Sequence, residues 1–168
     1  MIREFKGKKP FIHDTAIVDE SAIIMGNVFV GKNASIWPDV LIRADDEPVF
    51  IEEGACIMDK AFIEAPSEVF IGKGSVISHG ATVHGSRIGE NVMVGIGAIV
   101  LEVEVGKNSI IGAGSVVNKN VDENSFFAGV PAKKIRELKE EEIKRTKQIA
   151  REIMEKASHL KNIKFKMD

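Results

Sequence analysis

The sequence predicts an all-β solenoid, a parallel β-helix built from six-residue repeats, with one C-terminal α-helix packed along it. Three observations lead to this fold. A six-residue repeat runs from about Ile12 to about Val121, small residues recur at a fixed place within it, and the composition changes after about Val130.

In each repeat an aliphatic residue comes first, and Ala, Ser or Val usually follows four places later, as in Ile71–Val76, Val94–Ile99 and Ile111–Val116. A period of six fits neither a helix nor the two-residue alternation of a long strand. It fits short strands separated by tight corners, with Gly and Asn where the corners need unusual backbone angles. Three strands close one triangular coil, so about eighteen repeats predict roughly six coils.

Extra residues interrupt the period around Asp46–Pro48 and around Pro66–Glu68, while the repeats that open at Val83 and Val100 are each one residue short. An insertion in a solenoid loops outward at a corner, often on the binding face. We therefore expect two outward loops beside the polar residues described below.

The predicted domains are a β-helix over residues 1–130 and an amphipathic helix with a tail over residues 131–168. The second segment is rich in Lys, Glu and Arg, and three glutamates near its start favour the helix dipole. Lys164 to Asp168 are expected to fray. The apolar residues expected to face the solenoid are Ile135, Leu138, Ile143, Ile149, Ile153, Met154, Ala157 and Leu160.

The bulk composition excludes several classes of protein. The net charge of -2 gives no electrostatic footprint for nucleic acid. The sequence has no run of about 18 apolar residues, so it predicts no membrane span, and the N-terminus lacks a signal-peptide hydrophobic stretch. The single cysteine, Cys56, excludes an intrachain disulfide and suits a cytoplasmic protein.

The repeat also predicts which distant residues are stacked. With three repeats per coil, Arg43, Glu64 and His84 occupy the same outward position in successive coils, about 4.8 Å apart. Met25 and Leu101 bound this column with apolar side chains. A Glu beside a His at that spacing is half of a metal site.

The remaining histidines occupy other positions. His79 lies at a corner, so it points more easily toward the column of a neighbouring subunit than toward His84 of its own chain. His13 and His159 are expected to be ordinary surface residues. The residues alone leave open a hydrogen-bonded interface cluster of Glu64, His79 and His84 that holds no metal.

Three segments, Ser35–Asp45, His79–Gly85 and Ala128–Lys133 followed by a helix, resemble the γ-class carbonic anhydrase family over nearly the whole chain. The Trp-to-Arg-x-Asp and His-x4-His-Gly motifs are specific to that family, whereas the hexapeptide repeat alone would equally suggest acyltransferases.

The resemblance implies a homotrimer of left-handed β-helices with a metal site at each subunit interface. In the family three His ligands hold Zn²⁺ or a related divalent ion, two from one chain and one from its neighbour. His84 matches a ligand of the first chain and His79 the neighbour's ligand. The implied metal is Zn²⁺ first, with Fe²⁺ or Co²⁺ as the other candidates, and the implied substrate is CO₂ or bicarbonate.

Several positions depart from the family pattern. Glu64 stands where the family has its remaining His ligand, and Cys56 and Met58 stand where it has Asn and Gln near the metal-bound solvent. Arg43 and Asp45 are retained, and in the family they form an ion pair beside the site. Asp46 follows where some members carry an acidic proton-transfer residue.

These departures change the expected chemistry. Two His and one carboxylate remain a zinc ligand set, but an anionic ligand makes the bound water less acidic, and replacing Gln by Met removes a group that could orient hydroxide. Cys56 could supply a thiolate or be a small semi-buried residue. The leading hypothesis is a trimeric carbonic-anhydrase-like protein with weak or retuned CO₂ hydration.

Two other classes of function fit the sequence. One is a catalytically inactive structural or scaffold homologue that keeps the trimer. The other is a hexapeptide-repeat acyltransferase or acyl-CoA thioesterase-like enzyme, in which an interface His serves as general base.

Overall fold

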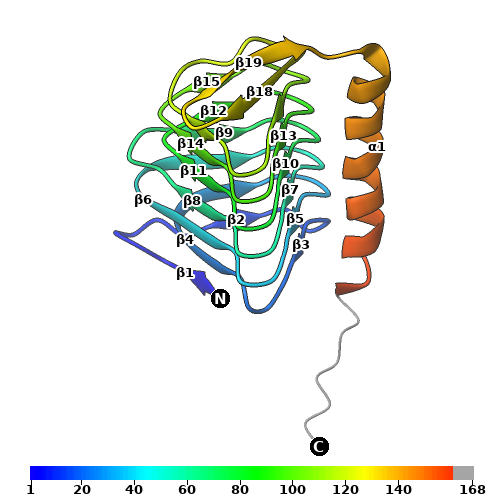
Figure 1. Cartoon of the computed structure of the whole chain (residues 1–168). Coiled ribbons are helices and arrows are strands. Elements are labelled where there is room, and N and C mark those ends of the chain that lie inside the picture. The colour runs from blue at the N-terminus through cyan, green and yellow to red at the C-terminus, as the bar shows by residue number, and fades with distance from the viewer. Residues whose placement is uncertain (161–168) are drawn as a thin grey trace, which may run out of the picture.

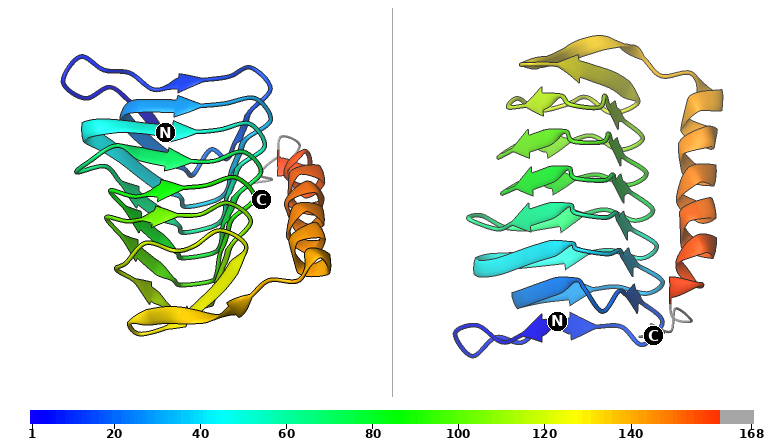
Figure 2. Two further views of the ribbon diagram at one scale, coloured as in Figure 1. Left: turned by 90° about the horizontal axis from the view of Figure 1, so that it is seen from above. Right: turned by 60° about the horizontal axis from the view of Figure 1, so that its bottom comes forward.

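The protein is a left-handed parallel β-helix with one α-helix alongside, as the computed structural model shows for residues 1–160 (Figure 1). The coils stack as successive layers, and the chain returns from the last layer as α1 (Glu140–Ala157), which runs back along the stack (Figure 2). This confirms the predicted fold. The expectation for Lys164 to Asp168 lies outside the described residues.

Two of the three faces of the β-helix belong to one sheet, because the long strands β4 and β6 turn the corner between these faces. We call the first the histidine face: the N-terminal halves of β4 (Ile23–Val30) and β6 (Leu41–Ile51), then β8 (Phe62–Glu64), β11 (Thr82–His84), β14 (Ile99–Leu101) and β17 (Val116–Val117). The second carries β2 (Phe11–Ile12), the C-terminal halves of β4 and β6, β9 (Val69–Ile71), β12 (Arg87–Ile88) and β15 (Glu104–Val105), while β1 (Ile2–Arg3) pairs with β4.

The third face, here called the helix-covered face, is a separate sheet that lies beneath α1 (Figure 1). Its strands are β3 (Ile17–Val18), β5 (Ser35–Ile36), β7 (Cys56–Ile57), β10 (Val76–Ile77), β13 (Met93–Val94), β16 (Ile110–Ile111), β18 (Ser125–Gly129) and β19 (Ala132–Glu137). All of these strands pair in parallel except β19, which is antiparallel to β18. The parallel strands form seven layers, one more than expected, because β18 adds a layer beyond the last repeat that the six-residue pattern marks.

The interior is filled by aliphatic residues in register. On the helix-covered face Ile36, Ile57 and Ile77 are stacked and fully buried, and on the histidine face Ile42 and Ile63 are stacked in the same way. On the helix-covered face the small buried residues Val40, Ala61 and Ala81 follow four positions later. Each layer therefore stacks a buried side chain on a similar one in the next layer. This stacking fixes the register of the strands and, with it, the positions of the outward side chains.

The interruptions of the repeat are accommodated outside the core. Gly26 pairs with Ala44 but Val28 pairs with Val49, so the residues around Asp46 form an irregularity within β6 rather than the separate loop that we expected. The second insertion leaves the strands between Glu64 and Val69, as predicted. Insertion at a corner keeps the buried residues on both sides in register.

The start of the C-terminal helix differs from the prediction. Residues 132–137 form β19, which pairs with β18, and Ile135 is exposed on it rather than lying on a helix. A helical spacing of Ile135 and Leu138 suggested otherwise, but the edge of β18 offers unpaired backbone groups that β19 satisfies.

The helix begins at Glu140 for a local reason. The Glu142 carboxylate accepts a hydrogen bond of 2.9 Å from the Lys139 backbone N–H and two of 2.7 Å from the Arg136 guanidinium. The Arg136 contacts, followed by the Lys139 backbone contact, lower the pKa of Glu142 to about 2. The helix buries Thr146, Ala150 and Ala157. No helix among residues 1–160 is long and apolar enough to span a membrane.

The close stacking of corner glycines generates a prediction. A Cβ added at Gly72 would lie 2.5 Å from the Gly89 carbonyl carbon of the next layer. We expect Gly72→Ala to lower the free energy of unfolding by about 1–3 kcal/mol, because the layers must separate to admit the methyl group. Lys32→Ala, at an exposed position of an equivalent corner, should change it by less than about 0.5 kcal/mol. Urea denaturation at fixed protein concentration measures both, and equal effects would contradict the close-stacking argument.

Candidate functional site: a charged column beside an exposed histidine corner

The column that the repeat predicts is present on the histidine face. Strand register pairs Met25 with Arg43, Arg43 with Glu64, Glu64 with His84 and His84 with Leu101. The three polar members are half-buried. Because each follows a buried core residue in its strand, alternation of side chains points it outward.

Charges of opposite sign alternate along this column. The Arg43 guanidinium forms an ion pair with Glu64 Oε1, and its Nε lies 3.2 Å from Asp45 Oδ2. The latter contact is an ion pair by distance, but Nε is not aligned to donate a hydrogen bond. The other Glu64 oxygen, Oε2, lies 3.8 Å from His84 Nε2. Glu64 thus lies between a permanent cation and an imidazole.

His84 has a second carboxylate neighbour. Its Nδ1 lies 3.8 Å from Oε1 of Glu102, which is mostly exposed. Both ring nitrogens therefore face carboxylate oxygens at distances longer than a direct hydrogen bond.

His79 lies apart from this column, at the corner between the helix-covered face and the histidine face. Its side chain is 52% exposed, and its Nδ1 lies 2.9 Å from Asp59 Oδ2. An imidazole whose Nδ1 is held by a carboxylate keeps Nε2 for another partner. Asp59 escaped the sequence reasoning, although the coil count could have found it: Asp59 is 20 residues before His79, as Glu64 is 20 residues before His84.

Apolar side chains surround both histidines on the outer surface. Ile96 lies at the His79 corner one layer further on and is 59% exposed. Ile99 and Leu101 pair with Thr82 and His84 on β11 and are also exposed. Exposed large aliphatic residues grouped around polar side chains are typical of a surface that a partner covers.

The other sequence-predicted residues lie away from the column. Asp46 is 66% exposed and its nearest cation is Lys6 at 3.9 Å. His13 is hydrogen-bonded to Thr15 on the surface, and His159 is exposed. Asp45 alone among the acidic residues of this segment approaches Arg43.

Cys56 and Met58 do not lie on the histidine face of their own subunit. Both are buried in an apolar cluster with Val76, Trp37 and Ala150, beneath α1. Burial raises the pKa of the Cys56 thiol to about 11. The suggestion that Cys56 supplies a thiolate is therefore wrong, because its environment strongly favours the neutral thiol.

The candidate ligands do not all come together within the described chain. Among residues 1–160 no group of three His, Cys, Asp or Glu side chains is close enough to hold a metal ion. Glu64 and His84 lie side by side on the histidine face, whereas His79 lies at a corner.

The buried thiol generates a prediction. Because folding raises the pKa of Cys56 from 9.0 to about 11, its contribution to stability is complete below pH 9 and is lost as the pH rises toward 11. Urea denaturation should show a loss of stability over this window in the wild type that is reduced in Cys56→Ala. In the folded protein iodoacetamide should alkylate Cys56 slowly at pH 8, and rapid alkylation would contradict the burial argument.

The chain is similar to proteins named carbonic anhydrase and to a hexapeptide-repeat protein of known structure. No protein-family model matches the chain. A carbonic anhydrase of Geobacillus kaustophilus is 34% identical over 166 residues, which cover 96% of this chain and 91% of that protein. A probable carbonic anhydrase of Methanocaldococcus jannaschii is 44% identical over 138 residues, which cover 79% and 87%.

A similar solved structure is a hexapeptide transferase family protein from Anaplasma phagocytophilum. It superposes with a TM-score of 0.91 at 32% identity and covers 94% of this chain and 96% of its own. The repeat and these relatives agree: the chain belongs to the γ-class carbonic anhydrase-like family of hexapeptide-repeat proteins.

Proposed function

We propose that the protein is a cytoplasmic homotrimer that holds a divalent metal, with Zn²⁺ as the first candidate, through Glu64 and His84 of one subunit and His79 of the next. The observation that carries this proposal is the stacking of Glu64 on His84, with their donor atoms facing one another across 3.8 Å. The relatives named carbonic anhydrase support the proposal of a divalent metal.

The donor atoms of Glu64 and His84 fit a shared metal. Ligand atoms around a tetrahedral zinc lie roughly 3.3–3.6 Å apart, given bonds of about 2.0–2.2 Å. The observed separation of 3.8 Å is within a small side-chain adjustment of that range. The other oxygen of Glu64 is held by Arg43, and ligating carboxylates commonly have such an outer partner.

His79 fits the third ligand. Asp59 holds its Nδ1, which leaves Nε2 as the free donor, and a His that binds metal usually has such a carboxylate behind it. Since His79 is exposed at a corner while the column lies on a face, the third donor has to come from a subunit packed corner to face. Ile96, Ile99 and Leu101 provide apolar surface for that packing.

The proposed activity is weak or retuned hydration of CO₂. A bound divalent ion would supply Lewis acidity toward water. Glu64 adds a negative charge to the ligand set and so reduces that acidity. Arg43 partly offsets this charge and, with Asp45, fixes the position of the carboxylate. Met58 lies beneath α1 and adds no polar group to the column, and Asp46 is exposed, where it would exchange protons with solvent.

A second candidate follows from the ion pairs themselves. Asp45, Arg43, Glu64 and His84 already form a ladder of alternating charges without any metal. In that case Glu64 links Arg43 to His84 through its two carboxylate oxygens and no metal is needed. The trimer would then be a catalytically inactive scaffold.

Metal analysis separates the two candidates. Protein purified after growth with Zn²⁺, Co²⁺ or Fe²⁺ should contain close to one metal per subunit. His79→Ala, His84→Ala and Glu64→Ala should each lower this content at least about tenfold, because each removes one of three donors. His13→Ala is the matched control, since it removes a surface histidine on another part of the fold. A metal-free wild type that remains an oligomer would establish the scaffold.

Glu64→His tests why activity is weak. It restores a neutral ligand and releases Arg43 to pair with Asp45 alone, so the Lewis acidity of a bound metal should rise. Stopped-flow CO₂ hydration should increase by at least about tenfold relative to the metal-loaded wild type. Glu102→His, which places an imidazole on the other side of His84, is the control. Unchanged hydration in a metal-loaded Glu64→His variant would contradict the proposed role of Glu64.

The oligomer has its own prediction. Light scattering should give a mass of about three times the 18.4 kDa of one chain. Leu101→Lys places a charge in the apolar part of the proposed interface and should shift the mass toward that of one subunit. Ile135→Lys, at a still more exposed aliphatic site on β19, should leave the trimer intact. A wild type with the mass of one chain would contradict the shared site.

A further inference from the structure

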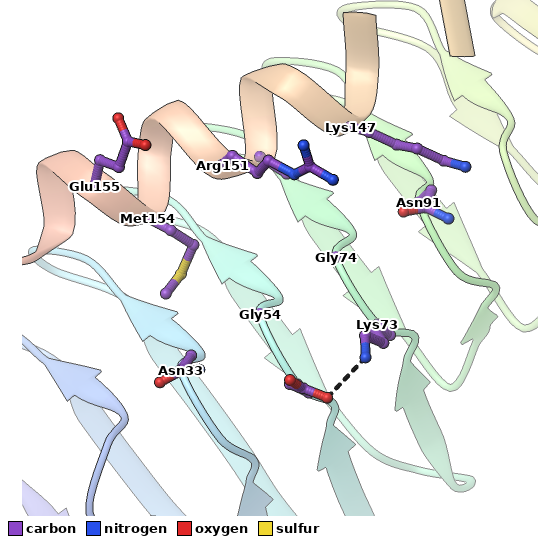
Figure 3. Close-up of a pocket in the computed structure, with 11 residues that line it drawn as sticks. Asn33, Gly54, Lys73, Gly74, Asn91, Lys147, Arg151, Met154 and Glu155 are labelled. Carbon is purple, nitrogen blue, oxygen red and sulfur yellow. Dashed lines mark hydrogen bonds and ion pairs between the residues drawn. The ribbon is translucent and has the colours of Figure 1, made fainter. Parts of the chain in front are cut away.

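A recess lies apart from the charged column, between α1 and the corner that precedes strands β7, β10 and β13 (Figure 3). It is an open groove of about 460 Å³, a size within the range of small-molecule sites. Its floor is the corner backbone at Gly54 and Gly74, and its roof is the α1 segment from Lys147 to Glu155. Strands β7 and β10 separate this groove from the His79 corner.

The groove exists because two side chains are missing from an otherwise regular column. Successive layers place Asn33, Gly54, Gly74, Asn91 and Asn108 at this corner, all with positive φ. In the later layers the asparagines form a ladder, with the Asn91 amide donating to Asn108 across 3.4 Å. Gly54 and Gly74 carry no side chain there: a Cβ at Gly54 would meet no atom within 4 Å, and one at Gly74 would lie 3.1 Å from Asn91 Oδ1.

The groove is cationic at one end. Lys147 and Arg151, one helical turn apart on α1, extend over Gly74 and Asn91 (Figure 3). Neither forms an ion pair with any other residue in the described part of the chain. Lys73 lies beneath them and is paired with Glu53 at 2.8 Å, while Glu155 lines the groove near its other end (Figure 3). The groove is therefore lined by three cationic side chains and two carboxylates, and two of the three cations have no ion pair within the described residues.

The other end carries an apolar side chain beside polar ones. Met154 extends from α1 over the corner between Asn33 and Gly54 (Figure 3). The buried Ala150 also lines the groove. A ligand that spans the groove would place an anionic group at Arg151 and an apolar group at Met154.

We propose that this groove binds a small phosphate-bearing organic molecule, with the phosphates held by Lys147 and Arg151 and the organic part lying against Met154. Guanidinium binds phosphate oxygens in pairs, and lysine adds a point charge. The groove does not share a residue with the charged column, so the proposal of phosphate binding does not depend on the proposed metal site.

Calorimetric titration with two probes tests the proposal. Pyrophosphate carries the charge alone, and ADP carries the same diphosphate with an organic part. Both should bind saturably with a Kd below about 1 mM, and ADP should bind at least about threefold more tightly. Lys147→Gln/Arg151→Gln should weaken both probes at least about tenfold, whereas Met154→Ala should weaken ADP alone.

Two matched controls separate a built site from general charge. Lys144→Gln/Lys156→Gln removes the same net charge from the same helix outside the groove and should leave binding unchanged. Gly54→Asn fills the groove with the side chain that neighbouring layers carry there and should abolish binding. Gly114→Asn, at another corner glycine with φ of +65° and open space, should not. Absence of saturable binding to the wild type, or equal losses in the two double variants, would overturn the proposal.

Discussion

Parallel stacking in register is the constraint on which the remaining structure depends. Ile63 lies over Val83, and Ile57 over Ile77, because each coil must bury the same kind of side chain against the next. Once the interior is fixed, alternation along each strand fixes the outward residues as well. The irregularity around Asp46 and the insertion at Pro66–Glu68 are therefore confined to corners, and Arg43, Glu64 and His84 remain one above another.

This constraint gives one residue an unusual influence. Glu64 has Arg43 on one side and His84 on the other, and the fold allows it no other neighbours in the column. With a neutral imidazole at position 64, Arg43 would pair with Asp45 alone. The Glu64 carboxylate instead contacts both the Arg43 guanidinium and the His84 imidazole. The same geometry therefore describes both a two-donor half-site and a complete ladder of ion pairs, and the difference between enzyme and scaffold depends on what His79 of a neighbouring subunit adds.

Residues inside the repeat could be predicted from the sequence, and residues that depend on other elements could not. Counting coils placed Arg43, Glu64 and His84 in one column and His79 at a corner, because the period alone determines register. It did not place Cys56 and Met58 beneath α1, since the position of a helix that follows the repeat has no period to fix it. The strand at 132–137 was missed for a similar reason: its pairing is set by the free edge of β18, whereas its own spacing of Ile135 and Leu138 suggests a helix.

The most direct test of the shared metal site is complementation between two inactive subunits. His79→Ala and His84→Ala protomers should each form metal-free trimers, because every interface lacks one ligand. When the two variants are co-expressed, a mixed trimer contains interfaces that combine an intact His79 with an intact His84. The account predicts that purified mixed trimers recover metal, at up to about one ion per trimer, as measured by elemental analysis. Mixed trimers that stay metal-free, while wild-type trimers bind metal, would contradict a site shared between subunits.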